Sequence, residues 1–342
     1  MTSLETSKKV KDEQKNTDSK ANIESTFVEA LSDRNYSCCG SESSSEESSP
    51  KTIDDTTVRR EVRKQYRAIA TETNQSEDDG SEILKQNLET SGYTWYSEED
   101  LDSIPQGANL GLGSGNPVKL ASVRPGEVVV DLGSGAGVDV FLASKKTGSN
   151  GKVIGVDMTP EMVDKARSNV RSGKYDNVEF RLGEIEHLPI ADNTADLIIS
   201  NCVINLSVDK SQVFRDAYRV LKPGGRLVIS DIILEKELPK VVRDAIQHVP
   251  GCLTRSQTER EYLSLIESAG FVNVETLDKM ILSPRDSQNK KLLEENFEGT
   301  RKARVILDGK PVEIDMSAEE IKELSTSISA AHIRAIKPKI GP

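Results

Sequence analysis

The 342-residue sequence has no apolar run long enough for a transmembrane helix, and it does not start with a hydrophobic signal segment. We therefore expect a cytoplasmic protein without membrane contacts, and a monomer. Basic residues are also in the minority, with 45 Lys and Arg against 56 Asp and Glu and a formal charge of −11. Because nucleic-acid binding needs a basic surface, this balance argues against a nucleic-acid partner.

Cysteine is scarce: the chain has four, Cys38, Cys39, Cys202 and Cys252. In a reducing compartment we expect thiols, which serve as packing atoms, nucleophiles or ligands of soft ions. The adjacent pair Cys38–Cys39 lies in a polar segment, and vicinal thiols suit a thiophilic ion. Two incidental cysteines in a tail are the alternative interpretation.

The chain is organised around the stretch Glu127–Asp139. Val128–Val130 predict a buried strand that ends at Asp131, and a helix follows from residue 138. Three glycines separate the two at alternate positions, Gly133, Gly135 and Gly137. A strand, a glycine turn and a helix start bring backbone amides against a nucleotide-like ligand. We assign Asp139, in the first helical turn, to the helix dipole rather than to chemistry.

The glycine pattern also indicates the kind of ligand. It is G-x-G-x-G rather than the G-x-G-x-x-G of dinucleotide sites, and the loop has no lysine to bind a pyrophosphate. A nucleoside with a cationic or zwitterionic tail, such as S-adenosylmethionine, fits better.

Strand and helix patterns alternate through the rest of the chain. Strands are predicted over residues 152–158, 177–183, 195–202, 226–232 and 272–277, and helices over 57–69, 159–170, 209–221 and 257–269. This alternation predicts an α/β fold with a mainly parallel sheet and helices on both faces. Residues 327–337 are expected to add an antiparallel edge strand, and a turn at 307–311 indicates a hairpin within residues 284–325.

Polar side chains follow the predicted strands at one edge of this sheet, namely Asp131, Asp157, Glu184 and Cys202. Ligands of parallel sheets bind outside the carboxyl ends of the strands, so these groups predict the site. Asp157 stands about twenty residues past the glycine turn, where a carboxylate accepts both ribose hydroxyls.

The stretch from Asp131 to Asp231 resembles the class I S-adenosylmethionine-dependent methyltransferases and, more narrowly, the arsenite methyltransferases. The glycine loop and Arg219–Arg226 are general features of such enzymes. The segment Asn201-Cys-Val-Ile-Asn-Leu206, together with the later Gly251-Cys252, is far more specific. Further similar stretches are Gly107–Pro117, Gly155–Met158 and Gly183–Pro189.

The resemblance implies a Rossmann-like methyltransferase that methylates trivalent arsenic for detoxification. Cys202 and Cys252 would be the catalytic thiolates that bind arsenic, a soft ion that prefers three sulfurs in a pyramid. The third sulfur would come from Cys38 or Cys39, or from a thiol reductant such as glutathione or thioredoxin. Since the arsenic lone pair attacks the methyl group, no general base is needed, and catalysis rests on positioning and exclusion of water.

The resemblance also implies a cofactor site for S-adenosylmethionine. Asp131 and the glycines would hold the methionine end, Asp157 the ribose, and Ile185 and Glu186 the adenine. The complete implied set is Asp131, Gly133, Ser134, Gly135, Gly137, Asp157, Met158, Glu184, Ile185, Glu186 and Asn201.

Four regions follow from these patterns. Residues 1–56 form an acidic, Ser-rich tail that we expect to be disordered. Residues 57–116 form a helical leader that covers the cofactor, and residues 117–235 form the methyltransferase domain. Residues 236–342 bind substrate and complete the sheet.

The sequence departs from the arsenite methyltransferase pattern at three places. The family usually carries a cysteine pair just after the first helix, whereas residues 70–92 have none; Cys38-Cys39-Gly40 resembles that pair, displaced to the other side of the helix. Ser114 stands where the family usually has a cysteine, and Leu253-Thr254 replaces the usual Gly-Ala. A methyltransferase of the same fold that acts on a small organic metabolite is therefore one alternative. A non-catalytic protein that senses arsenic or thiols is another.

Overall fold

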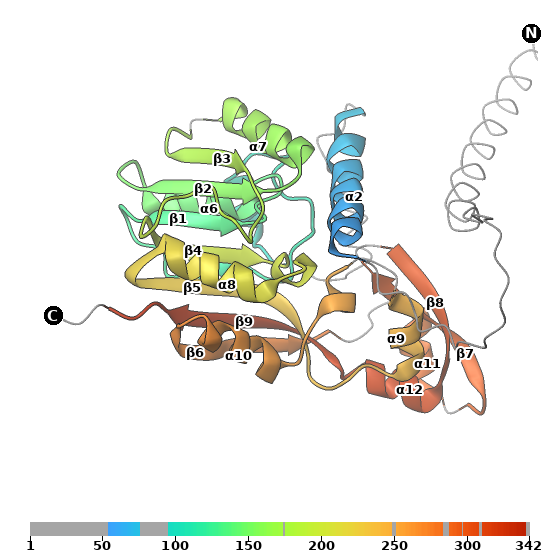
Figure 1. The fold of residues 1–342 in the computed structure, drawn as a ribbon. Coiled ribbons are helices and arrows are strands. Elements are labelled where there is room, and N and C mark those ends of the chain that lie inside the picture. The colour runs from blue at the N-terminus through green and yellow to red at the C-terminus, as the bar shows by residue number, and fades with distance from the viewer. Residues whose placement is uncertain are drawn as a thin grey trace, which may run out of the picture. The chain divides into compact units, whose positions relative to one another are not determined.

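A seven-stranded sheet forms the centre of the computed structural model, with the strand order β3-β2-β1-β4-β5-β9-β6 (Figure 1). The structure describes residues 54–75, 95–173, 175–247, 251–282, 287–295, 297–307 and 310–339. The strands are β1 (Val128–Leu132), β2 (Lys152–Asp157), β3 (Val178–Leu182), β4 (Ala195–Asn201), β5 (Leu221–Leu234), β6 (Val272–Ile281) and β9 (Ile328–Ile336). The strands β1 to β5 pair in parallel, and the predicted α/β class is confirmed.

The antiparallel strand lies elsewhere than predicted. β9 is not at the edge of the sheet: it is inserted between β5 and β6 and pairs antiparallel with both. Its small and apolar residues Ala330, Ala331, Ile333 and Ala335 are all buried, as suits a strand with a neighbour on each side. β6 takes the edge and leaves Val272 43% exposed.

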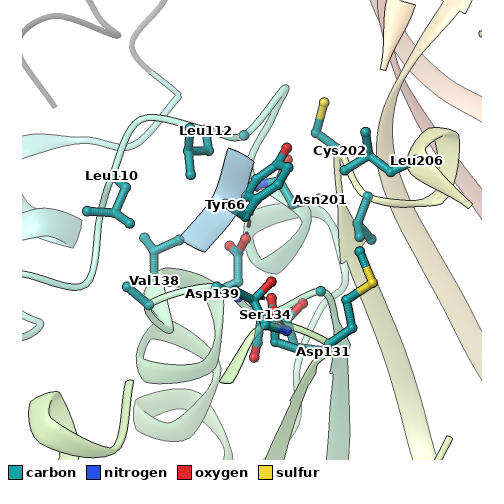
Figure 2. A pocket seen from close by; sticks show the side chains of 18 of the residues that line it. Tyr66, Leu110, Leu112, Asp131, Ser134, Val138, Asp139, Asn201, Cys202 and Leu206 are labelled. Atoms are coloured by element: carbon teal, nitrogen blue, oxygen red, sulfur yellow. Dashed lines mark hydrogen bonds between the residues drawn. The ribbon is translucent and has the colours of Figure 1, made fainter. Parts of the chain in front are cut away.

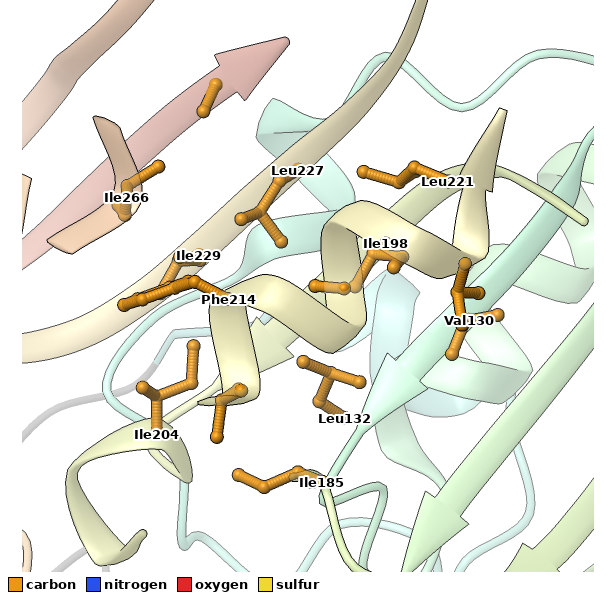
Figure 3. Packing of buried hydrophobic residues seen from close by; sticks show 14 of the residues in the cluster. Val130, Leu132, Ile185, Ile198, Ile204, Phe214, Leu221, Leu227, Ile229 and Ile266 are labelled. Carbon is orange, nitrogen blue, oxygen red and sulfur yellow. The ribbon is translucent and has the colours of Figure 1, made fainter. Parts of the chain in front are cut away.

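Helices cover both faces of the sheet, because successive strand residues point to opposite sides. Val130, Phe214 and Ile266 belong to one buried cluster on the face covered by α8 and α10 (Figure 3). Val129 packs with Phe141 on the other face. These covering helices are α5 (Pro117–Leu120), α6 (Val138–Thr147), α7 (Pro160–Ser172), α8 (Lys210–Val220) and α10 (Glu259–Ser268).

The C-terminal region adds a small layer with its own apolar core, which includes Leu238 and Met316. It consists of α9 (Lys240–Ile246), α11 (Ser287–Glu294), β7 (Thr300–Leu307), β8 (Lys310–Ser317) and α12 (Ala318–Leu324). The predicted hairpin is confirmed, since β7 and β8 pair antiparallel. Short elements elsewhere are α4 (Glu98–Asp102), η1 (Ile204–Leu206) and η2 (Leu253–Arg255).

Helix α2 (Asp55–Gln75) is the amphipathic helix that the sequence predicts. It buries Val58 and Val62 against Leu206 and Cys252, beyond the carboxyl ends of the strands (Figure 1). Apart from residues 54–56, the predicted N-terminal tail lies outside the described residues. No helix in the described part of the chain has the length and apolar character of a membrane span.

Candidate active site

A cavity lies at the carboxyl ends of β1, β2 and β4, between the glycine loop and α2 (Figure 2). Most residues that the sequence analysis assigns to the cofactor line it: Asp131, Gly133, Ser134, Gly135, Asp157, Met158, Ile185, Glu186 and Asn201. Gly137 and Glu184 lie outside the lining. Gly137 has a φ of +103° and packs so closely that a Cβ would lie 2.7 Å from Phe141. The Glu184 carboxylate lies 2.6 Å from Arg63 of α2.

Asp157 is held by the backbone of the glycine loop and of α7. Its Oδ2 accepts a hydrogen bond from the Gly135 N–H (3.0 Å), and its Oδ1 accepts one from the Thr159 N–H (2.8 Å). Burial raises the pKa of Asp157, and the two N–H groups act against that rise. Each carboxylate oxygen keeps a second lone pair, which suits a ligand with two neighbouring hydroxyls.

Asp139 and Tyr96 are site residues that the sequence analysis missed. The Tyr96 hydroxyl and the Asn201 amide each donate to Asp139 Oδ2 over 3.0 Å, and all three residues line the cavity. Asp139 does lie in the first turn of α6, but its carboxylate faces the cavity wall, so our assignment to the helix dipole is incomplete. Tyr96 is 43 residues away in sequence, and no local pattern points to this contact.

Several buried carboxyl groups line the cavity wall. Burial raises the pKa of Asp139 to about 6, with Asn201 and Tyr96 acting against it. Burial, together with Asp139 and Asp157, raises the pKa of Asp131 well above its usual range. Asp139 Oδ1 is buried and has no hydrogen-bond partner in the described part of the chain. Buried carboxylates of this kind are stabilised by a cation, so the cavity suits a positively charged ligand.

Helix α2 closes the outer side of the cavity with Arg59, Val62 and Tyr66. Arg59 lies 3.6 Å from the carboxylate of Glu186, which also accepts a hydrogen bond from Ser207 (2.6 Å). The helix therefore contacts the region that the resemblance assigns to adenine.

The two thiols lie side by side. The Sγ atoms of Cys202 and Cys252 are 3.4 Å apart, and Cys252 Sγ donates to the Cys202 carbonyl over 3.2 Å. The two sulfurs are not bonded to each other, since their separation is far longer than the roughly 2.05 Å of a disulfide. Cys202 follows β4 with a φ of +56° and lines the cavity, whereas Cys252 is 4% exposed.

The described residues offer no third protein ligand beside this pair. Among the described residues no group of three His, Cys, Asp or Glu side chains is arranged to hold a metal ion. Cys38 and Cys39 lie outside the described residues. Ser114, at the position where the family usually has a cysteine, is buried, and its N–H donates to Asn201 Oδ1 (2.9 Å). That serine thus adjoins the residue preceding Cys202.

Residues 124–270 match the methyltransferase domain family. This part of the chain is therefore similar to methyltransferase domains. Over 184 residues the chain is 50% identical to the arsenite methyltransferase of Halobacterium salinarum, covering 54% of this chain and 47% of that protein. It is 40% identical to the human arsenite methyltransferase over 152 residues, which are 42% of this chain and 40% of that one. It thus spans about half the length of the curated relatives that it matches.

The fold also resembles a solved structure with a named activity. An arsenic(III) S-adenosylmethionine methyltransferase from Chlamydomonas reinhardtii superposes with a TM-score of 0.52 and 27% identity, covering 75% of this chain and 74% of that one. The resemblance to arsenite methyltransferases that the sequence motifs predict is confirmed.

Proposed function

We propose that this protein transfers a methyl group from S-adenosylmethionine to trivalent arsenic bound by Cys202 and Cys252, as a step of arsenic detoxification. The observation that carries the proposal is the sulfur pair, 3.4 Å apart at the edge of a cavity walled by buried carboxylates. Relatives named arsenite methyltransferases support the choice of acceptor.

The spacing of the two sulfurs suits a pyramidal ion. If the sulfur–ion bonds are about as long as zinc–sulfur bonds, roughly 2.3 Å, a sulfur separation of 3.4 Å subtends an angle of about 95°. A tetrahedral ion needs about 109°, and its two sulfurs would stand farther apart. Three bonds near a right angle leave a lone pair on the ion, which is the arrangement of trivalent arsenic.

The cavity also fits S-adenosylmethionine. We place the ribose at Asp157, the adenine at Ile185 and Glu186, and the ammonium group at the unpartnered Oδ1 of Asp139. When bound, the cofactor supplies an electrophilic methyl group on a positively charged sulfur, next to buried Asp131.

The protein residues act by orientation and exclusion of water. The thiolates of Cys202 and Cys252 hold arsenic with its lone pair toward the cavity, and α2 covers the two reactants. No side chain has to accept a proton, because the lone pair is the nucleophile. In this proposal the third sulfur comes from a thiol reductant such as glutathione or thioredoxin, or from the Cys38–Cys39 pair.

The test incubates the full chain with S-adenosylmethionine, arsenite and glutathione and measures methylated arsenic. The variants are Cys202→Ser, Cys252→Ser and the double variant Cys38→Ser/Cys39→Ser. We expect at least a hundredfold loss of rate in each of the first two, with cofactor binding retained. A loss of rate in the double variant would indicate that the Cys38–Cys39 pair supplies the third sulfur, and an unchanged rate would indicate an external thiol.

Two outcomes would overturn the proposal. A wild-type protein that binds the cofactor but methylates no arsenic, in a screen where small organic acceptors are methylated, would make it a metabolite methyltransferase. Tight binding of arsenite and cofactor without any turnover would make it a sensor.

A further inference from the structure

A row of buried polar groups lies behind the two thiols and connects the segments that carry them. One of these segments, residues 201–207, carries Cys202, and the other, residues 251–256, carries Cys252. In the described part of the chain no disulfide joins these segments, so their spacing depends on noncovalent contacts.

Asn205 is the centre of this row. Its side chain is fully buried, and its Nδ2 lies 2.9 Å from Asp231 Oδ1, 2.7 Å from the Ile232 carbonyl and 3.4 Å from Ser256 Oγ. The Ser256 hydroxyl in turn donates to the carbonyl of Cys252 over 2.7 Å. One amide therefore links β5 to the backbone of the second cysteine.

Asp231 anchors this amide to the sheet. Its Oδ1 also accepts the N–H of Ile232 (2.9 Å), and its Oδ2 accepts the hydroxyl of Tyr262 (3.0 Å). Both Asp231 and Tyr262 are fully buried. Because a carboxylate with three donors in a buried site has little freedom, it fixes the orientation of the Asn205 amide.

A second connection joins the same two segments at their outer ends. The Lys210 ammonium donates to the carbonyl of Arg255 (2.8 Å), and Arg255 Nε donates to the carbonyl of Ser207 (3.2 Å). The segment after Cys252 is thus held at both Ser256 and Arg255.

We propose that Asn205, oriented by Asp231, is a positioning residue that sets the distance between the two thiols. The inference deepens the proposed function, since a bidentate arsenic site needs sulfurs at a defined separation. A purely structural role for Asn205 would lower stability and leave two-thiol binding intact in the folded protein.

The experiment uses the full chain with Cys38→Ser and Cys39→Ser, so that Cys202 and Cys252 are the only thiols left. Phenylarsine oxide, which bridges two thiols, is titrated against this protein and against Asn205→Ala in the same background. A maleimide, which needs only one thiol, gives the reactivity of the single cysteines.

Asn177→Ala is the matched control. The Asn177 amide likewise bridges backbone carbonyls, those of Ser144 and Gly148, both at 3.0 Å, but it lies beside α6 and away from the thiols. Both variants lose a cross-linking amide, so a general loss of stability affects both.

We expect Asn205→Ala to bind phenylarsine oxide at least tenfold more weakly, with maleimide labelling no slower than in the parent and Asn177→Ala unchanged. A folded Asn205→Ala that binds phenylarsine oxide as tightly as Asn177→Ala overturns the inference. If Asn205→Ala does not fold, Ser256→Ala decides: weaker binding by at least threefold supports the inference, and unchanged binding overturns it.

This experiment can refute the positioning role of Asn205 without refuting the proposed function, and the reverse also holds. Phenylarsine oxide binding requires neither cofactor nor turnover. A protein whose two-thiol binding depends on Asn205 but which methylates no arsenite would refute the proposed function and leave the positioning role standing.

Discussion

The hydroxyl of Tyr96 donates to Oδ2 of Asp139 over 3.0 Å, and Oδ1 of the same carboxylate is left buried without a partner in the described part of the chain. A second donor, Asn201, holds Oδ2 from β4. The carboxylate is therefore fixed by one oxygen while the other remains available to a ligand that carries an N–H⁺ group.

Asp139→Asn should weaken S-adenosylmethionine binding at least tenfold, because a neutral amide no longer pairs with the ammonium group. Isothermal titration calorimetry measures this directly. Asp102→Asn, at an exposed acid in α4, serves as the control and should bind like the wild type. If Asp139→Asn and Asp102→Asn bind S-adenosylmethionine equally well, Asp139 does not contact the cofactor.

Cofactor binding should weaken as the pH falls through 6. Burial raises the pKa of Asp139 to about 6, so the carboxylate takes up a proton in this range and loses its charge. The affinity measured from pH 7.5 to 5 should drop for the wild type and drop less for Asp139→Asn. If Asp139→Asn loses as much affinity as the wild type over this pH range, the loss is due to a group other than Asp139.

The ligand-free protein should become more stable as the pH falls from 7.5 to 5.5. Burial raises the pKa values of four carboxyl groups, those of Asp131, Asp139, Asp157 and Asp231, the second and fourth to about 6. The folded state then binds protons that the unfolded chain has released, and its stability rises toward acid pH.

Basic groups whose pKa is lowered by burial oppose this trend near neutral pH, namely His332 and Lys210, the latter with a pKa of about 8. As the pH falls, the unfolded chain binds these protons more fully than the folded state does, but the four carboxyl groups outweigh them. The measurement is the Tm without ligand at both pH values. A Tm that is lower at pH 5.5 than at pH 7.5 would contradict the prediction.

Arg63→Ala should weaken cofactor binding by roughly twofold to fivefold, the scale of a partly exposed ion pair. Arg63 joins α2 to Glu184 at 2.6 Å, next to the cavity, and its side chain is 46% exposed. Lys64→Ala is the matched control, because Lys64 pairs with Glu61 within α2 itself. The loss in Arg63→Ala should shrink at high salt, and a salt-independent loss would speak against an ion-pair effect.

Gly133→Ala should abolish cofactor binding. Gly133 has a φ of +64°, and an added Cβ would lie 2.3 Å from Val203, the residue after Cys202. Gly126→Ala also has a positive φ, of +82°, but a Cβ there meets nothing within 4 Å. Both variants place a non-glycine residue at a positive φ, which costs about 1–3 kcal/mol of stability. Only Gly133→Ala should in addition lose cofactor binding, as measured by calorimetry. Retained binding would show that the loop adjusts.

Patterns along the sequence predict most of the architecture that brings the site together. Apolar strands alternating with helices predict a parallel sheet, and Asp131, Asp157 and Cys202, which follow the strands, then meet at one edge. The amphipathic pattern of α2 likewise predicts its buried face, with Val58 and Val62. These features follow from local periodicities, so the pattern of apolar residues in the sequence is enough to predict them.

The contacts between side chains from distant segments could not be predicted in this way. The place of β9 inside the sheet depends on its pairing with β5 and β6. The sequence pattern of an alanine-rich strand does not distinguish an edge position from one between two neighbouring strands. Tyr96 meets Asp139 across 43 residues, and Cys202 meets Cys252 across 50. The position of Asn205 behind the thiols is of the same kind, because contacts between distant segments follow from packing and leave no periodic signal in the sequence.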